Sequence, residues 1–383
     1  MFNAFRNSDA AYYLYSAFVI ILGLGSLVFF YFMVTGFNIG VYSSNTVVGD
    51  VYVGGLSESE AESKVRARID EWYDDESITY EIGYQGYYYE VDRNLFSFDV
   101  NATFENINEG QRNRLAVELS PQALSNIDFE LRNAPFMSGL QDIFDIDTVL
   151  DEITEDAARL QQFSRHQLNH YVIDRAQLVV TIEEITIPPH PGVDLDTLLA
   201  QIEAEYEDLR IPVEAHSIFS VFDKFPETIG SSALNTIGSG LLDLIMRTPF
   251  DIYERHYNPQ VDNIQTSPYI GRNVRVNRHP SLNYNFQFEN TTYLNYEIEF
   301  YEAAQGMLGM RLHGPSPLNS VEIETEEIVL PYRSAPEDAT IITEGQEGKV
   351  VFITRRIHDI NDELKDETLI VFEYYEPFDP IYE

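Results

Sequence analysis

An uncharged apolar run near the N-terminus constrains this chain more than any other feature. No charged residue lies between Asp9 and Asp50, and residues 12–37 are almost wholly apolar. A helix needs about 20 such residues to cross the roughly 30 Å hydrocarbon layer of a bilayer, so this run is long enough to cross with some tilt. Tyrosines near its start and a Phe-Phe-Tyr-Phe cluster near its end match the interfacial positions that aromatic side chains favour. We therefore predict a transmembrane helix at residues 10–37.

The charges on either side of the run predict its orientation. Arg6 precedes the run, and the first base after it is Lys64. Because basic flanks stay in the cytoplasm, we expect residues 1–9 to form a cytoplasmic tail. Residues 38–50 are then a linker to an extracellular body. The run is too long for a signal-peptide core and no small-x-small cleavage motif follows it, which favours an uncleaved signal-anchor over a cleaved signal peptide.

The composition of the chain excludes several kinds of partner and chemistry. It contains 63 acidic and 24 basic residues, a net charge of −39, and no cysteine. A surface of this charge repels nucleic acid and anionic lipid, so we expect no nucleic-acid partner. The lack of cysteine excludes disulfide bonds and thiol catalysis. The acids are spread along the chain, which favours adaptation of the surface to its surroundings over a dedicated acidic binding surface.

The hydrophobic pattern predicts an α+β fold, beginning with a domain at residues 51–140. Ser57 and Glu60 have the spacing of a capping box. After them Ala61, Val65, Ile69 and Trp72 recur at helical spacing. Further along, the pattern predicts strands at 78–82, 87–91 and 95–100 and a helix at 104–119.

Three further segments follow in the remaining sequence. Residues 141–215 repeat the α+β plan, residues 216–318 mix a helix with β-rich sequence, and residues 319–383 are strand and turn throughout. The expected elements are a helix at 146–160, strands at 169–173 and 177–185, a helix capped by Asp194, a helix at 234–246, and strands at 284–288, 296–301, 307–312, 349–357 and 368–375.

Several short blocks resemble families of bacterial envelope proteins. VYVGGLS at 51–57, with FDVNAT at 98–103, resembles the peptidoglycan-binding-like domain that precedes VanW domains. Blocks between 219 and 292 resemble a VanW domain in order and approximate spacing, and the tail is similar to a G5-like β module. The VanW-like blocks are FS at 219–220, GSGLL at 238–242, FDIYERH at 250–256, YIGRNVRV at 269–276 and FENTT at 288–292, and those of the tail are EGQEGK at 344–349 and YYEP at 374–377. The resemblance implies a wall-associated envelope protein.

Three positions depart from the VanW pattern. Many VanW domains carry Cys-Gln where this chain has Leu242 and Asp243, and many relatives carry a second histidine where this chain has Asn258. Any chemistry that depends on that cysteine is excluded here.

The candidate ligand-binding residues are Glu254, Arg255, His256 and Arg272, together with the tyrosines Tyr87 and Tyr89. Arg255 and Arg272 could bind the carboxylates of a peptide stem in a bidentate manner, with His256 as a donor. The competing interpretation is a buried ion-pair network with a purely structural role. The tyrosines could stack on sugar rings, or they could form a strand with one dry and one wet face.

No enzyme motif is visible in the sequence. Ser-x-x-Lys, His-Glu-x-x-His, Gly-x-Ser-x-Gly and the phosphate-binding Gly-x4-Gly-Lys pattern are all absent. We expect no catalytic residue, no metal and no cofactor. The favoured hypothesis is a membrane-anchored, non-catalytic envelope protein that binds or organises peptidoglycan or another wall component. The alternatives are a structural subunit of an envelope-spanning machine such as a pilus or secretion apparatus, with protein partners, and a wall-remodelling enzyme.

Overall fold

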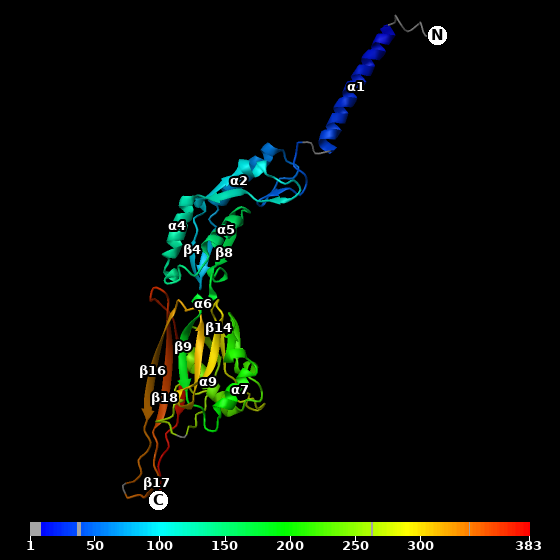
Figure 1. The fold of residues 1–383 in the computed structure, drawn as a ribbon. Helices are drawn as coiled ribbons and strands as arrows, with labels where there is room; N and C mark the ends of the chain where they lie inside the picture. The colour runs from blue at the N-terminus through cyan, green and yellow to red at the C-terminus, as the bar shows by residue number, and fades with distance from the viewer. Residues whose placement is uncertain (1–8, 37–39, 262, 337) are drawn as a thin grey trace. The chain divides into compact units, whose positions relative to one another are not determined.

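The computed structural model describes residues 9–36, 40–261, 263–336 and 338–383, so the predicted cytoplasmic tail lies almost wholly outside it. The described chain is a mixed α+β structure, as predicted, and it divides into two compact units (Figure 1). The first unit contains the described residues up to Gly83, Tyr88–Ala134 and Asp145–Tyr171. The second contains Tyr84–Tyr87, Pro135–Phe144 and Val172–Glu383.

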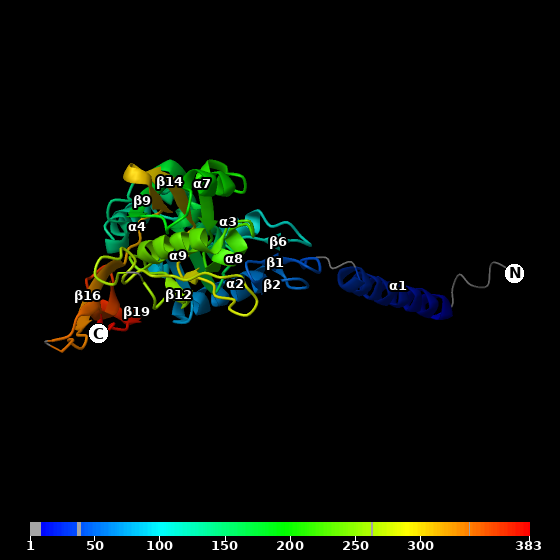
Figure 2. The same ribbon diagram turned by 90° about the horizontal axis from the view of Figure 1, so that it is seen from below.

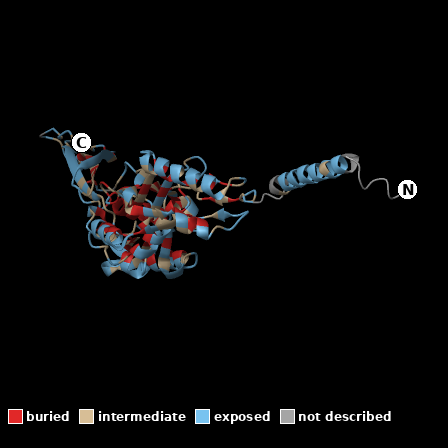
Figure 3. Cartoon of the chain, turned by 90° about the horizontal axis from the view of Figure 1, so that it is seen from above, coloured by how far each residue is buried: buried red, intermediate tan, exposed pale blue. Residues whose placement is uncertain are grey.

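The predicted apolar helix is present as α1, Asp9–Gly36. Its segment Tyr12–Met33 is the one span in the described chain that is long and apolar enough to cross a membrane. None of the residues in that window is buried, and Figure 3 shows most of the window pale blue. A helix from the core of a soluble domain would bury one face, so α1 is consistent with a membrane anchor.

Trp72 forms the centre of the first unit. It lies on α2 (Glu58–Asp74), and the Glu60 carboxylate accepts a hydrogen bond of 2.9 Å from the backbone N–H of Ser57, as expected for the capping box. The Trp72 ring has no exposed surface and meets the rings of Tyr80 and Phe98 edge-on. Its indole N–H donates to the Gln161 carbonyl at 3.1 Å, which satisfies the one polar atom of the side chain.

The sheet nearest to this core has the order β4-β3-β8, and two of its strands run parallel. The antiparallel strands β5 and β7 form a separate pair. The bounds of these elements are β3 Thr79–Tyr84, β4 Tyr87–Glu90, β5 Phe96–Asp99, β7 Ala116–Leu119 and β8 Phe163–Gln167, with the helices α4 Pro121–Arg132 and α5 Ile146–Ala157.

Two sequence predictions in this region are wrong. The helix expected at 104–119 is replaced by the short helix α3, Val100–Glu105, followed by strands. The helix ends at its C-cap residue Asn106, and Gly110 in the following turn takes a left-handed conformation with φ +77°. The strand expected at 169–173 is a 3-10 turn, and the strand that pairs with β3 is β8, a few residues earlier.

The second unit is built on a four-stranded antiparallel sheet with the order β10-β14-β15-β9. Helix α9, Ser231–Ile245, lies against β9 and β15 (Figure 2). Gly240 allows this close packing, because a Cβ atom there would lie 2.6 Å from Met310. The strands are β9 Val180–Ile187, β10 Arg210–Val213, β14 Tyr296–Ala303 and β15 Met307–Gly314, and helix α7, Leu195–Glu203, contacts β14.

Two smaller sheets complete the second unit. One has the order β11-β13-β12, from Ser217–Ser220, Gln287–Asn290 and Asp251–Glu254. The other has the order β16-β18-β19, from Ser320–Leu330, Gly348–His358 and Leu364–Tyr375. Stacked rings of Phe219, Phe288 and Phe250 fill the core beside the first of these sheets. Strands β12 and β19 each pair on one side only, so each leaves an open edge.

Candidate functional site

Arg255 lies in a buried polar network rather than on an open surface. Its side chain is 10% exposed and forms an ion pair with Glu373, which has no exposed surface. The Glu373 carboxylate also accepts hydrogen bonds from the backbone N–H of Gly271 at 2.7 Å and of Asn273 at 3.1 Å, and from the Tyr375 hydroxyl at 2.7 Å. The geometry favours the structural interpretation of Arg255, with Glu373 in place of Glu254 as its partner.

Burial is the main cause of the pKa shifts of Glu373 and Tyr375 in this network. Burial raises the pKa of the Glu373 carboxyl, while Arg255 and the three other donors oppose that shift. Burial also raises the pKa of Tyr375, and the neighbouring Glu373 adds to the shift. Tyr375 therefore keeps its proton and donates it in the hydrogen bond to Glu373.

Arg272 belongs to a different contact, at the junction between helix α9 and the segment that contains Gly271. It forms an ion pair with Asp243, which is buried, and its Nε donates to the Pro268 carbonyl at 2.6 Å. Ser239, in the same helix, accepts a hydrogen bond from the Val274 N–H at 3.0 Å. The Gly-Ser-Gly-Leu-Leu-Asp block therefore joins α9 to the neighbouring segment.

Glu254 and His256 form a third contact. His256 Nε2 lies 3.0 Å from Glu254 Oε1, and the imidazole stacks on Tyr284 with ring centroids 4.3 Å apart. Glu254 also accepts from the Asn285 N–H at 2.9 Å. The four polar residues singled out in the sequence are thus divided among three separate contacts and do not converge on one ligand position.

The two candidate tyrosines also lie in separate places. The Tyr89 hydroxyl donates to Glu130 at 2.7 Å in the first unit. The Tyr87 hydroxyl donates to Asn319 at 3.0 Å and accepts from Lys365 at 3.2 Å in the second unit. Both are half-buried while Tyr88 between them is exposed, the alternation expected for a strand with one dry and one wet face.

A groove of about 950 Å³ opens between strand β12 and strand β19, and we call it the β12–β19 groove. Arg255 and Arg355 line it, and Lys365 lies at the same groove. Arg355 is 2% exposed in its side chain, donates to the carbonyls of Thr248 and Phe250, and forms an ion pair of 3.1 Å with Asp251. Three basic residues thus line the groove together with two acidic ones, Asp251 and Asp366.

The sequence analysis missed Arg355 and Glu373, although the pattern of their strands contains a signal. Arg355 occupies the same inward face of β18 as Val351, Ile353 and Ile357. Glu373 occupies the same inward face of β19 as Val371 and Tyr375. A charged residue at an inward position of a strand needs a buried partner. That signal identifies both residues as internal, but it does not identify which groups they meet.

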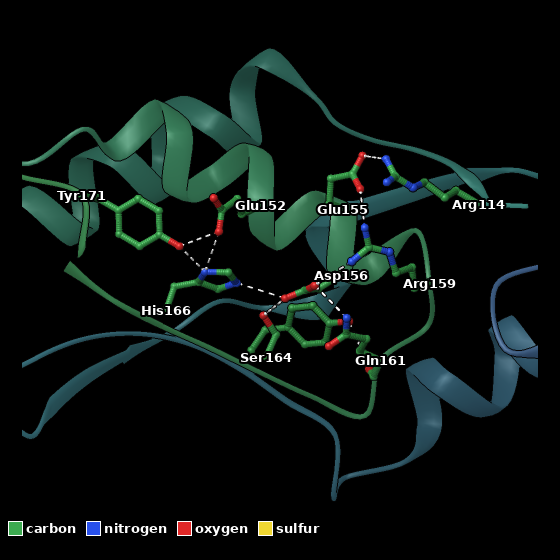
Figure 4. A network of polar contacts seen from close by, with 10 residues as sticks. Arg114, Glu152, Glu155, Asp156, Arg159, Gln161, Ser164, His166 and Tyr171 are labelled. Atoms are coloured by element: carbon green, nitrogen blue, oxygen red, sulfur yellow. Dashed lines mark hydrogen bonds and ion pairs between the residues drawn. The ribbon is translucent and has the colours of Figure 1, made fainter. Parts of the chain in front are cut away.

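A second polar network lies in the first unit, around His166 (Figure 4). His166 Nε2 lies 3.0 Å from Asp156 and Nδ1 lies 2.6 Å from the Tyr171 hydroxyl, which in turn donates to Glu152 at 2.6 Å. Burial and the Glu152 carboxylate raise the pKa of Tyr171, so this hydroxyl keeps its proton and donates it to Glu152. The network fastens β8 to helix α5.

Comparison with protein-family models, with curated proteins and with solved structures found no match to this chain. The resemblance to VanW domains and their neighbours therefore stays a prediction. Within the described residues, no group of three or more His, Asp or Glu side chains is arranged to hold a metal ion.

Proposed function

We propose that this chain is a single-pass membrane protein whose acidic extracytoplasmic body binds or organises peptidoglycan without catalysis. The observation that carries the proposal is α1, an apolar helix of 28 residues whose membrane-length segment is unburied. An apolar surface of this size is stable only in an apolar surrounding, and a bilayer supplies one. Arg6 before the helix and the base-free stretch after it support a cytoplasmic N-terminus.

The wall-binding part of the proposal is supported by the family-like blocks and by the groove. The VanW-like blocks of the second unit lie in helix α9, in strands β11, β12 and β13 and in the segment 269–276, and a groove lined by basic and acidic residues opens beside β12. A groove that offers fixed polar groups and apolar walls is the usual form of a binding site.

Protease added to intact protoplasts tests the topology. We expect digestion of the body and survival of a membrane-held fragment of roughly 40–50 residues. A variant with three lysines inserted directly after residue 40 serves as the matched control, because added positive charge there should reverse the orientation in part of the population. Protection of the wild-type body in intact protoplasts, with digestion after permeabilisation, would contradict the topology.

Binding to purified sacculi tests the activity. The full chain in detergent should sediment with sacculi, and no muropeptides should be released into the supernatant. Released muropeptides would show a wall-remodelling enzyme instead, and no sedimentation would reject wall binding.

An exposed apolar surface supports the second candidate function, a structural subunit of an envelope machine. The strand pair β17 (Ile341–Thr343) and β20 (Ile381–Tyr382) carries Ile342 and Ile381, each more than half exposed. Exposed apolar clusters mark protein interfaces. Affinity purification from native membranes should yield stoichiometric protein partners if this alternative holds.

A further inference from the structure

We propose that the His166 network of the first unit is a proton-binding site. It holds one proton more than the same side chains carry when they are separate and exposed at neutral pH, and this proton fastens strand β8 to helix α5. The site is independent of the proposed function, because it concerns the cohesion of the first unit and not what the body binds.

Four polar contacts form a chain through the network (Figure 4). His166 Nε2 lies 3.0 Å from Asp156, and the Ser164 hydroxyl donates to the same carboxylate oxygen at 2.8 Å. On the other side of the ring, Nδ1 lies 2.6 Å from the Tyr171 hydroxyl, which lies 2.6 Å from Glu152. At these distances each contact holds one hydrogen between its two heavy atoms, because two lone pairs facing each other would repel.

The side chains bring one hydrogen too few for these contacts. In the separate and exposed state at neutral pH, Ser164 and Tyr171 each carry one hydroxyl hydrogen, the neutral ring of His166 carries one N–H, and the two carboxylates carry none. Three hydrogens cannot fill four contacts. The fourth is an added proton, whichever atom of the network holds it.

The imidazole ring of His166 is the place for this added proton. Burial and the Glu152 carboxylate raise the pKa of Tyr171, so its hydroxyl keeps its hydrogen and donates it to Glu152. Nδ1 then donates to the Tyr171 oxygen, while Nε2 donates to Asp156. Both nitrogens of an imidazole carry hydrogen only when the ring is a cation.

The two acids of helix α5 stabilise a cation at this ring. Glu152 lies 3.4 Å from Nδ1 and Asp156 lies 3.0 Å from Nε2, so a carboxylate stands at each end of the ring. The side chains of His166 and Asp156 are only 13% and 15% exposed. Solvent ions therefore screen the attraction between them much less than they screen a surface pair.

Charged and titratable groups on the neighbouring segments do not cancel this attraction. Arg159 approaches Asp156 at 3.7 Å, but Glu155 holds the same guanidinium more closely, at 3.0 Å. Glu155 also forms an ion pair with Arg114. The Tyr80 hydroxyl, from strand β3, keeps its hydrogen because burial raises its pKa, and so it adds no charge.

The added proton links the stability of the first unit to pH. In the unfolded chain a histidine ring loses its second proton near pH 6.5. Above that pH, folding takes up a proton at this site. The stability that the site supplies is therefore present in full below about pH 6.5 and is lost as the pH rises.

Glu152→Gln tests the proton count, because the glutamine amide brings the missing hydrogen. Its N–H donates to the Tyr171 oxygen, Tyr171 donates to Nδ1, and Nε2 donates to Asp156, so a neutral ring fills all four contacts. Glu152 is 53% exposed, and the variant should fold. Glu155→Gln is the matched control, since Glu155 lies on the same helix, is 41% exposed, and contacts two arginines instead of the ring.

Nitrogen NMR of the full chain in detergent micelles, with isotope-labelled histidine, reads the ring directly. The chemical shifts of the two ring nitrogens distinguish an imidazolium from either neutral tautomer, and His166→Gln identifies the signals by their disappearance. At about pH 7.5, one unit above the usual histidine value, both nitrogens of His166 should carry hydrogen in the wild type and in Glu155→Gln. In Glu152→Gln only Nε2 should carry one.

Melts at a series of pH values measure the linkage to stability. Above about pH 6.5, the unfolding equilibrium constant of the wild type should rise by up to about tenfold per pH unit relative to that of Glu152→Gln, which is the effect of one proton. Glu155→Gln should follow the wild type.

Three results would overturn the proton-binding site. They are a neutral His166 ring in the wild type at about pH 7.5, parallel pH curves for the wild type and Glu152→Gln, and a neutral ring in Glu155→Gln. If Glu152→Gln does not fold, the ring signals of the wild type alone decide. Sedimentation with sacculi is a separate measurement, so each of these results leaves the wall-binding function as it stands.

Discussion

Glu373 illustrates how one buried carboxylate can hold several segments together. Its four donors come from Arg255, from two backbone N–H groups near Gly271, and from Tyr375. We expect Arg255→Met to lower the free energy of unfolding by about 3–5 kcal/mol, because Glu373 would remain charged and buried without its cation. Thermal and urea melts of the ligand-free protein measure this loss.

Three further variants make the Arg255 prediction specific. Arg66→Met, at an arginine that is half exposed, should leave the melt nearly unchanged. The double variant Arg255→Met with Glu373→Leu should recover part of the loss, because it removes both charges together. Arg272→Met should cost less than Arg255→Met, since Arg272 is 25% exposed and Asp243 keeps a second arginine, Arg247, at 3.5 Å. An unchanged melt for Arg255→Met would refute the structural role.

The burial of His190 predicts that the stability of the folded protein depends on pH. Its ring stacks on Tyr269 at 3.9 Å, its Nε2 is buried without a partner, and burial lowers its pKa below the usual value near 6.5. As the pH falls below about 6.5, the unfolded chain binds a proton at His190 before the folded chain does, so stability falls.

The variant His190→Phe isolates this effect. Phenylalanine keeps the stacking on Tyr269 but cannot take up a proton. Between pH 7.5 and 5.5 the melting temperature of the wild type should fall relative to that of His190→Phe. Parallel curves for the two proteins would mean that His190 titrates alike in the folded and unfolded states.

The Arg255–Glu373 pair could not be predicted from the sequence. The sequence offers two interpretations of Arg255, a ligand-binding residue or a member of a buried ion-pair network, and the structure favours the second. Its partner Glu373 lies 118 residues away along the chain. No periodicity or spacing connects two residues across such a distance, so only the tertiary fold reveals the pair.

Among the elements, the turn at Gly271 links the second unit's core to its C-terminal sheet. Gly271 has φ +79°, and a Cβ atom there would lie 3.2 Å from Ile353 on β18. We expect Gly271→Ala to destabilise the protein by about 1–3 kcal/mol from backbone strain alone, with an added penalty from crowding. Gly139→Ala is the matched control, because Gly139 has φ +77° but open space around it. A loss for Gly271→Ala no larger than that for Gly139→Ala would argue against close packing at this turn.

Elements with strong local signals were predicted, and those fixed by distant pairing were not. Ser57 and Asp194 cap their helices as expected, because capping depends on residues within one turn. The segment 104–119 was assigned to a helix from its composition. It contains the end of α3 and the strands β6 (Arg112–Asn113) and β7 instead, because pairing of β7 with β5 outweighs a weak helical preference.

For the whole molecule, the net charge of −39 predicts a response to salt. Excess acids repel one another in the compact state, and monovalent ions screen that repulsion. The melting temperature should therefore rise as sodium chloride increases from a few millimolar to molar concentration. A sucrose series of equal osmolality is the control for general solute effects. A flat curve would indicate that the acids are locally paired or too dispersed to matter.

Composition and hydropathy predict the α+β class of the molecule, but they do not predict its division into two compact units. The uncharged run predicted α1, and mixed periodicities predicted an α+β body. The second unit, however, includes Tyr84–Tyr87 and Pro135–Phe144, which lie in the sequence among residues of the first. Such an interleaved path leaves no mark in composition or hydropathy.

The long separation between Arg255 and Glu373 gives the chain an order of completion. A ribosome adds about 5–20 residues per second, so the 118 residues between them take about 6–24 s to synthesise. During that interval the nascent chain carries a guanidinium whose partner does not yet exist, and β18 lacks the strand that covers its side. The pairing of β18 with β19 and the Arg255–Glu373 ion pair therefore form only after synthesis has passed Glu373, and a chain that stops before Glu373 keeps an unpaired guanidinium and an uncovered edge of β18.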